Sequence, residues 1–595
     1  MIPSRWPVRT SSEIASITSK LISYESPQSF GSWRTNITLV ADDEFGTFDN
    51  ETFHVTQTKE LSNNHVPNTI NKDKIYLWDY PLLNGAKPEV NDAIVNSVNQ
   101  GTLILNYVGH GNPDLWAHEH VLNRTSDLPR LTNYEKLPLV FTASCAIGFF
   151  DDPKREGMAE DFIAMQGGAI SVVSATRLVY SSDNAAFNRE VFDILLYDDT
   201  LTMSEAVYAA KVKRQYATFK PPSPVLNDRN YLYFGDPFLR LANPINDVTV
   251  DSALNSLEAL RPARITGRVV DAGGNPITSD GQLTITVFDS ERDKTYRLVN
   301  DSGIVIQTID YKAAGPTIFR GTASITAGSY DFSFIPPLDI GYGGSGAKVS
   351  MYAVLGAIDA VGIIDSITVA TTVANSTDSA GPNISLSFSG KPFMPAGNLV
   401  SPGDILEIEL SDPSGINLAG GLGHGISIEF DGEAASAINL TGLFNFDQDD
   451  FTTGRLSYSL DQLEPGEHNI KIKAWDNANN SSSVSFTVDM VNSSFLAIQQ
   501  LLNYPNPMID KTIFSYSLTQ TVKKLTLEIF TLSGRKINSF QRFALVADYY
   551  DDIVWDGRDA YGDRVATGVY IFKATAQPTI GDAVEEFGKI VVINQ

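Results

Sequence analysis

The sequence predicts a multidomain protein in which an α/β region, with a parallel sheet covered by helices on both faces, precedes all-β sandwich modules. Up to about residue 245, apolar strand runs alternate with segments of helical periodicity, which is typical of such a sheet. Beyond that point helical periodicity largely disappears. Short alternating strands follow, separated by Gly, Pro, Asn and Asp turns, as in β-sandwiches. The 595 residues allow about three to five domains of about 100–200 residues each.

The α/β region begins and ends with helices that the sequence marks at their first residues. Thr10 and Glu13 form a capping-box pattern ahead of apolar residues at helical spacing, and Thr202 and Glu205 repeat it before the last long helix. Between them we expect helices at 90–98 and 158–165, and buried strands at 37–41, 102–107, 137–144 and 169–174.

Three β modules follow the α/β region of residues 1–245. We place one β-sandwich module at residues 246–375, a second, immunoglobulin-like module at residues 376–491, and a third at residues 492–595. The segment 371–382, TTVANSTDSAGP, is predicted to be a linker.

The composition excludes several classes of protein. A formal charge of −26 argues against a nucleic-acid binder, which would carry basic patches. No apolar run reaches the roughly 18 residues that a membrane helix needs, and the first residues lack the apolar core of a signal peptide. A single cysteine rules out an internal disulfide and leaves the compartment undecided.

Two predicted strands end in residues that could perform nucleophilic catalysis. The strand at 102–107 runs into Gly109-His110-Gly111, and the strand at 137–144 runs into Cys145, the only cysteine. Because ligands bind at the carboxyl ends of parallel strands, both side chains are expected at one edge of the sheet. The 35 residues between them fit one strand–crossover–strand unit.

A thiol and an imidazole in one pocket suit acyl transfer. The imidazole can take the thiol proton and later protonate the leaving amine. Glycines beside His110 allow a close backbone approach. The backbone N–H groups of Gly111 and Cys145 are candidates to stabilise an oxyanion. The alternative is that Cys145 is an inert core thiol, which is the more common role of an isolated buried cysteine.

Other histidines and acids are weaker candidates. A second Gly-His-Gly at 423–425 has no cysteine near it and indicates a turn. His118 and His120 would share one face of a strand, but no third zinc ligand is evident. Asp-rich turns at 447–449 and 551–552 are compatible with calcium, although no EF-type loop is present. We therefore expect no required cofactor and no metal at the catalytic site.

The same residues resemble the gingipain-type cysteine peptidases of family C25. The resemblance runs through residues 5–25, LNYVGHGNPDLWAHE (105–119), LPLVFTASCAIGFF (137–150), 167–182 and 233–244, in the order and at close to the spacing of the family. It implies a caspase-like α/β fold and a Cys145–His110 catalytic dyad. It also implies an acid that orients the histidine, for which Asp43 is our choice and Asp42 the alternative.

The sequence departs from the gingipains in two respects. Its first matching block corresponds to the middle of the family's catalytic region, so we expect that an upstream α/β half is missing. We also find no counterpart of the acid that gives arginine-cleaving members their specificity. Basic-residue specificity is therefore not expected.

The last module adds a second resemblance. YPNP at 504–507 and VWDGRDAYGDRVATGVYIFKA at 554–574 are similar to FlgD-like immunoglobulin domains and to type IX secretion C-terminal domains. Together with a C25 domain, this resembles the type IX sortases of Bacteroidota. The resemblance implies location on the outer face of the outer membrane. It implies as partners proteins that carry C-terminal sorting domains, outer-membrane proteins of the secretion system, and lipopolysaccharide as acceptor. A secreted protease that is itself cargo, and a non-catalytic adhesin or scaffold, remain the alternatives.

Overall fold

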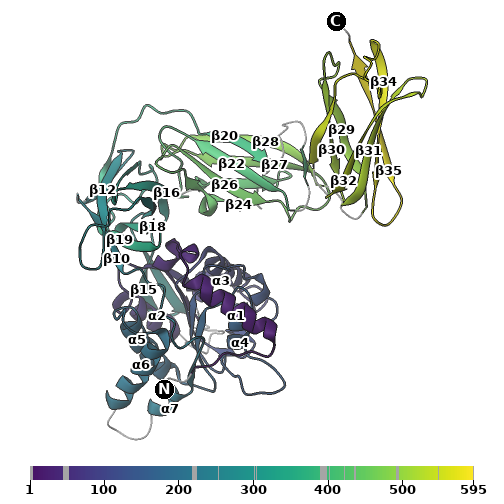
Figure 1. The fold of residues 1–595 in the computed structure, drawn as a ribbon. Coiled ribbons are helices and arrows are strands. Elements are labelled where there is room, and N and C mark those ends of the chain that lie inside the picture. Colours follow the sequence, from purple (N-terminus) through teal and green to yellow (C-terminus); the bar gives the residue numbers. More distant parts are fainter. Residues whose placement is uncertain are drawn as a thin grey trace. The chain divides into compact units, whose positions relative to one another are not determined.

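The computed structural model describes most of the chain (Figure 1). The described residues are 4–43, 52–217, 224–251, 254–299, 302, 304–388, 398–400, 403–420, 423–434, 437–490, 495–546 and 549–593. They divide into two compact units, one comprising residues 1–377 and 446–451, the other comprising residues 378–445 and 452–595. Each unit is described by itself below.

A six-stranded sheet forms the centre of the α/β region, with the strand order β2-β1-β3-β7-β8-β9. Its strands are β1 (Asn36–Ala41), β2 (Asn71–Tyr76), β3 (Ile104–Val108), β7 (Leu139–Ala143), β8 (Ser171–Ala175) and β9 (Tyr231–Phe234). The first five are parallel. A small three-stranded sheet lies between β3 and β7 in the chain and consists of β4 (Gly111–Asn112), β5 (Leu115–Trp116) and β6 (Leu122–Asn123).

Helices cover both faces of this sheet. The helices are α1 (Ser11–Tyr24), α2 (Phe53–Asn64), α3 (Pro88–Gln100), α4 (Met158–Ala164), α5 (Ser181–Leu195), α6 (Met203–Ala217) and α7 (Pro224–Arg229). One core cluster packs Leu39 and Phe141 of the sheet against Phe187 of α5 and residues of α2 and α6. A second cluster packs the other face, including Leu105, against residues of α3 and α4. Alternate residues of each strand therefore serve opposite cores.

The two predicted capping boxes begin helices as expected, with one difference. At α6, the Thr202 hydroxyl accepts the N–H of Glu205 at 3.2 Å, and the Glu205 carboxylate accepts the N–H of Thr202 at 2.9 Å. At α1, Thr10 accepts the N–H of Glu13 at 3.2 Å, but the Glu13 carboxylate accepts the N–H of Arg9 rather than that of Thr10.

The sheet is mixed rather than wholly parallel, which corrects the sequence prediction. β9 runs antiparallel to β8, with Val172 opposite Phe234. No strand was predicted here, because β9 has only four residues before Gly235-Asp236. Tertiary pairing, rather than local periodicity, determines this strand.

Residues 246–373 form one sheet where a sandwich was predicted. Its order is β10-β12-β17-β16-β13-β18-β19-β11, and β10 also pairs with β19, which closes the sheet on itself. The strands are β10 (Asn246–Val250), β11 (Ser256–Ala259), β12 (Ala263–Val270), β13 (Gly281–Phe288), β16 (Thr317–Thr326), β17 (Ser329–Phe334), β18 (Ala347–Leu355) and β19 (Ile358–Val373). A hairpin of β14 (Arg292–Val299) and β15 (Val305–Ala313) leaves this sheet.

That hairpin packs on the α/β region. Tyr296 stacks on Trp78 with ring centroids 4.0 Å apart, and Tyr311 joins Tyr76 and Ala41 in a small apolar cluster. Because Ala41 is the last residue of β1, the hairpin supports the end of the strand that leads into Asp42 and Asp43.

The second unit consists of two further groups of strands. Two sheets span residues 383–490 and contain β20 (Asn383–Phe388), β21 (Asn398–Val400), β22 (Ile405–Ser411), β23 (Ser427–Phe430), β24 (Ile438–Asn439), β26 (Thr453–Ser459), β27 (Gly466–Trp475) and β28 (Ser481–Met490); β25 (Asn445–Phe446) also pairs with β26. The last two sheets share one core and contain β29 (Ile498–Tyr504), β30 (Thr512–Leu518), β31 (Val522–Thr531), β32 (Lys536–Leu545), β33 (Tyr549–Trp555), β34 (Gly568–Gln577) and β35 (Val584–Val592).

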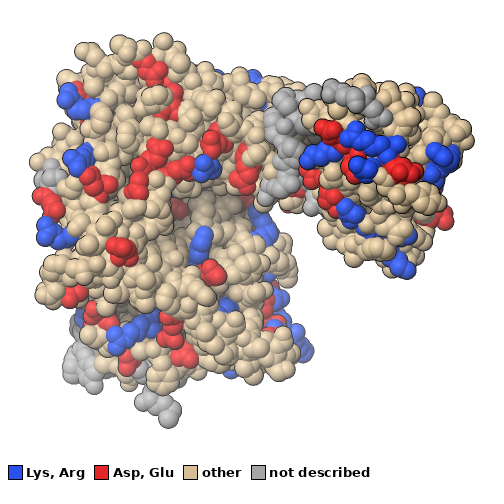
Figure 2. Space-filling model, turned by 45° about the horizontal axis from the view of Figure 1, so that its top comes forward, with Lys and Arg blue, Asp and Glu red and all other residues tan. Residues whose placement is uncertain are grey.

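The surface carries charges of both signs. Figure 2 shows acidic and basic side chains interspersed over the face in view, with most of that face formed by other residues. Within the described ranges, no helix has both the length and the apolar character needed to cross a membrane.

Candidate active site

Three adjacent strands end in register at the site. Ala41 of β1, Val108 of β3 and Ala143 of β7 lie side by side in the sheet. Asp43, His110 and Cys145 each follow their strand at the same offset of two residues. The structure therefore brings the three predicted residues to one edge of the sheet, and His110 and Cys145 to adjacent strands.

Glycine allows the two loops that carry His110 and Cys145 to approach closely. A Cβ atom on Gly111 would lie 2.6 Å from Ser144 Oγ and 2.8 Å from Ile147 Cδ1. One on Gly109 would lie 2.4 Å from Asp42 Cβ. A larger side chain at Gly111 would force the cysteine loop away, and one at Gly109 would displace Asp42, which gives a physical reason for Gly-His-Gly at this point.

The Cys145 thiol is half-buried and has a described partner. Its Sγ donates to the carbonyl oxygen of Val179 at 3.4 Å. The neighbouring residues Leu178 and Tyr180 are 80% and 76% exposed, so apolar surface lies beside the thiol. Behind it, burial and the nearby Cys145 raise the pKa of Tyr231 well above its usual value.

The two candidate acids have different contacts. Asp42 accepts the backbone N–H of His110 at 2.8 Å, and its other oxygen accepts the N–H of Asp43 at 3.0 Å. Asp43 instead pairs with the ammonium group of Lys87 at 2.5 Å. Asp42 is thus the acid in described contact with the histidine loop. The role of Asp43 in orienting the His110 ring stays a prediction.

Two further histidines surround His110, and sequence reasoning missed the first. His54 of α2 is buried, and its ring lies edge-to-face on that of His110, with centroids 5.3 Å apart. Burial, with a smaller contribution from His110, lowers the pKa of His54 to about 3. His118 lies on another side, at 5.1 Å. The sequence gives no signal for His54, because α2 follows no pattern that links it to the strand ends.

The histidines expected to be weak zinc candidates do not lie on a strand. His118 and His120 are exposed residues of a turn, and His120 has a φ of 58°. Neither belongs to a cluster of three possible metal ligands within the described parts of the chain.

The Asp-rich turns that were compatible with calcium make hydrogen bonds and ion pairs with other protein groups. Asp449 accepts hydrogen bonds from the N–H and hydroxyl of Ser324 at 2.7 and 2.5 Å, and Asp552 pairs with Arg542. A different group, Asp378, Asp412 and Asp476, gathers carboxylate oxygens within 4.8 Å of one another. Burial raises the pKa of Asp412 and of Asp476. Among the described residues of the second unit, these three are placed to hold a cation.

Comparisons with known proteins give one family match and several similar solved structures. Residues 1–242 match the model of peptidase family C25. Among solved structures, the chain is similar to dimeric latent PorU from Porphyromonas gingivalis, at 24% identity and a TM-score of 0.29, over 71% of this chain and 41% of that one. It is also similar to the Arg-specific cysteine proteinase gingipain R, at 17% identity and a TM-score of 0.33, over 62% of this chain and 74% of that one.

The chain thus spans about two fifths of the length of the PorU structure. No curated protein matches it at a significant level. The family match covers the whole α/β region, including both loops that carry His110 and Cys145. Residues 1–242 are therefore similar to peptidase family C25, the cysteine peptidases that their histidine and cysteine blocks resemble.

Proposed function

We propose that this protein is a cysteine endopeptidase that acts as a sortase of the type IX secretion system. The observation that carries the peptidase part is the C25 match over residues 1–242, with His110 and Cys145 following adjacent parallel strands. The sorting role is supported by the resemblance of residues 492–595 to type IX C-terminal domains.

The chemistry follows from the two side chains. The Cys145 thiolate attacks the carbonyl carbon of the scissile amide, while backbone N–H groups of Gly111 and Cys145 stabilise the oxyanion. His110 then protonates the amine as the C–N bond breaks, which leaves a thioester on Cys145. Attack by water gives hydrolysis and regenerates the thiol, whereas attack by an amine gives transpeptidation.

The proposed substrates are exported proteins that carry a C-terminal sorting domain. The proposed acceptor is an amine of surface lipopolysaccharide, and the proposed companions are PorV-like outer-membrane proteins of the secretion system. The protein would then act at the extracellular face of the outer membrane. Its acidic surface is compatible with a secreted protein that resists self-association.

One observation favours a second candidate. Residues 492–595 have a core of their own, around Phe514, Trp555 and Phe572. The same module would serve equally well as a cleavable sorting signal of a secreted C25 protease. The two candidates share the thioester chemistry and differ in the fate of this module.

A direct test incubates the full-length protein, including any upstream half, with a cargo protein that carries its sorting domain and with an amine acceptor. We expect mass spectrometry to show cargo without its sorting domain, ending in a free carboxyl group or joined to the acceptor. Cys145→Ala should give neither product.

His120→Ala is the matched control for a His110→Ala variant, because His120 is an exposed histidine of the neighbouring turn. The control should process cargo at the wild-type rate, and His110→Ala should lose activity by about two to four orders of magnitude. Processing of cargo by the Cys145→Ala protein would refute the proposal.

A further inference from the structure

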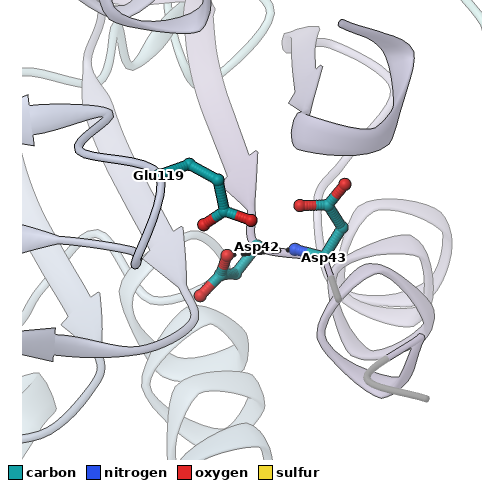
Figure 3. Close-up of side chains that lie close together, drawn as sticks. All are labelled: Asp42, Asp43 and Glu119. Atoms are coloured by element: carbon teal, nitrogen blue, oxygen red, sulfur yellow. Dashed lines mark hydrogen bonds between the residues drawn. The ribbon is translucent and has the colours of Figure 1, made fainter. Parts of the chain in front are cut away.

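Three buried carboxylates lie directly behind the histidine loop (Figure 3). Asp42 and Asp43 follow β1, and Glu119 comes from the turn after β5; they are 1%, 5% and 1% exposed. One oxygen of each lies within 4.8 Å of the others. In Figure 3 the Glu119 carboxylate points toward the two aspartates.

One ammonium group supplies the positive charge of this cluster. Lys87, the residue that precedes α3, donates from Nζ to Asp43 Oδ2 at 2.5 Å and to the Leu77 carbonyl at 2.8 Å. Its backbone N–H donates to the Glu119 carbonyl at 3.0 Å. Three carboxylates therefore face one buried cation, and the cluster is short of positive charge.

The hydrogen bonds show which carboxylate oxygens of the cluster lack a donor. Both oxygens of Asp42 accept backbone N–H groups, one from Asp43 and one from His110. In contrast, Asp43 Oδ1 and Glu119 Oε2 are buried and have no hydrogen-bond partner among the described residues. A buried carboxylate oxygen without a donor is costly, so some group must satisfy this pair.

A proton satisfies the pair more simply than a metal ion. A protonated carboxyl group is a donor, and one O–H on Glu119 would serve the free oxygen of Asp43. A calcium ion would need six to eight oxygen ligands, and the Lys87 ammonium already occupies one side of Asp43. Burial, with Asp43 as a second cause, raises the pKa of Glu119 to about 7, which supports this choice.

We propose that Glu119 is protonated in the working enzyme, donates a hydrogen bond to Asp43, and is thereby a positioning residue for His110. This inference rests on the proposed peptidase function. The path is short: Glu119 fixes Asp43, the N–H of Asp43 fixes Asp42, and Asp42 holds the backbone N–H of His110. Loss of the Glu119 proton removes the donor to Asp43 and places a second carboxylate charge beside it, and their repulsion displaces the loop.

The groups that face Glu119 set the sign of the pH effect. They are Asp42 and Asp43 after β1, Lys87 before α3, and Tyr107 of β3, with His110 and His118 in the adjoining loop. Since the folded pKa of Glu119 lies above its unfolded value, its contribution is complete at acid pH. It is lost as the pH rises through about 7.

The test compares full-length wild type with Glu119→Gln, whose amide can still donate to Asp43 but cannot ionise. The first readout needs no substrate. It is the melting temperature of the unfolding transition of the α/β region, measured as a function of pH. We expect wild type to lose stability between about pH 5 and about pH 8 through this group, and Glu119→Gln to lose less. Glu135→Gln, at an exposed acid, should follow wild type.

The second readout is the rate at which iodoacetamide alkylates Cys145, which reports on the His110 loop without requiring turnover. The ratio of the Glu119→Gln rate to the wild-type rate should rise about tenfold from about pH 6 to about pH 8, as the protonated fraction of wild-type Glu119 falls. A ratio independent of pH, with equal melting curves, would overturn the inference and leave the peptidase proposal untouched.

A metal ion bound by the three carboxylates is the alternative to a proton on Glu119. The same protein variants distinguish the two. Calcium or manganese, added to each protein separately, should leave the melting temperature of the α/β region of wild type unchanged. A cation-dependent rise in wild type that is absent from Glu119→Gln would show that the cluster takes a metal ion, and would overturn the proton assignment.

Discussion

His54 shows how one buried side chain can set the acid stability of the domain. Its ring is 3% exposed and packs on His110, and burial lowers its pKa to about 3. In the unfolded chain the same imidazole takes up a proton near pH 6.5. Its contribution to stability is therefore complete above about pH 6.5 and is lost as the pH falls toward about 3.

We expect His54→Phe to remove this acid sensitivity. At about pH 4.5 the wild type should have lost about 2–3 kcal/mol of the free energy of unfolding through this group, and the variant should not show that loss. The measurement is the urea-induced unfolding of the α/β region at several pH values. His120→Phe serves as the control, since His120 is exposed and should leave the wild-type pH dependence intact. Identical acid profiles for wild type and His54→Phe would contradict the assignment.

Cys145 gives the complementary prediction, that a residue can matter for chemistry and little for stability. Its thiol is half-buried just after β7, makes one described hydrogen bond, to the Val179 carbonyl, and packs at the margin of a core cluster. Cys145→Ala should change the free energy of unfolding by less than about 1 kcal/mol while abolishing acyl transfer. A large fall in melting temperature, with cargo processing retained, would instead identify the thiol as a core residue.

At the residue scale, the sequence could indicate the groups that follow strands but not those that pack behind them. His110, Gly111 and Cys145 could be predicted from the sequence because strand ends in a parallel sheet share an edge. His54, Lys87 and Glu119 were not, because each reaches the site from a helix or turn whose position depends on tertiary packing. Glu119 even lay between two histidines considered for zinc, and its burial was not evident from sequence.

At the scale of single elements, local signals identified helix starts well and strand direction poorly. Thr202 and Glu205 begin α6 with the reciprocal hydrogen bonds that the sequence predicted. The antiparallel β9 was missed because direction is set by pairing with β8. The closure of the sheet at 246–373 was missed for the same reason, since β10 and β19 are more than a hundred residues apart.

A buried ion pair connects the α/β region with the closed sheet and carries an element-scale prediction. Arg34 Nη1 lies 2.9 Å from Asp359 Oδ2 at the start of β19, and both residues are buried. Tyr352 of β18 also donates to Asp359 at 2.7 Å. Removing the carboxylate would leave the guanidinium buried without its ionic partner.

Asp359→Ala should therefore lower the free energy of unfolding of the first unit by about 3–5 kcal/mol. Asp331→Ala is the matched control, because it breaks an ion pair with Arg264 in the same module where both partners are exposed. That change should cost at most about 1 kcal/mol. Calorimetry of the full chain measures both variants, and equal effects would contradict a structural role for the buried pair.

At the scale of the whole molecule, the last module decides between the two candidate functions. Residues 492–595 have their own core, in which Trp555 is 1% exposed and donates from Nε1 to the Arg558 carbonyl at 2.7 Å. A module with an independent core can stay folded whether or not it remains attached to the rest of the chain. Its fate is therefore determined by processing rather than by stability.

If the proposed sortase function holds, the mature protein should retain residues 492–595, because a sortase acts on the sorting domains of other proteins. Peptide mapping of surface-shaved protein by mass spectrometry should recover segments from β34 and β35 at the same abundance as segments from β3 and β7. The matched comparison is a Cys145→Ala strain, in which retention must be equal if the module is not a substrate of this enzyme. Recovery of the catalytic region without the last module in wild type, together with its retention in the Cys145→Ala strain, would identify the protein as self-processed cargo and refute the sortase assignment.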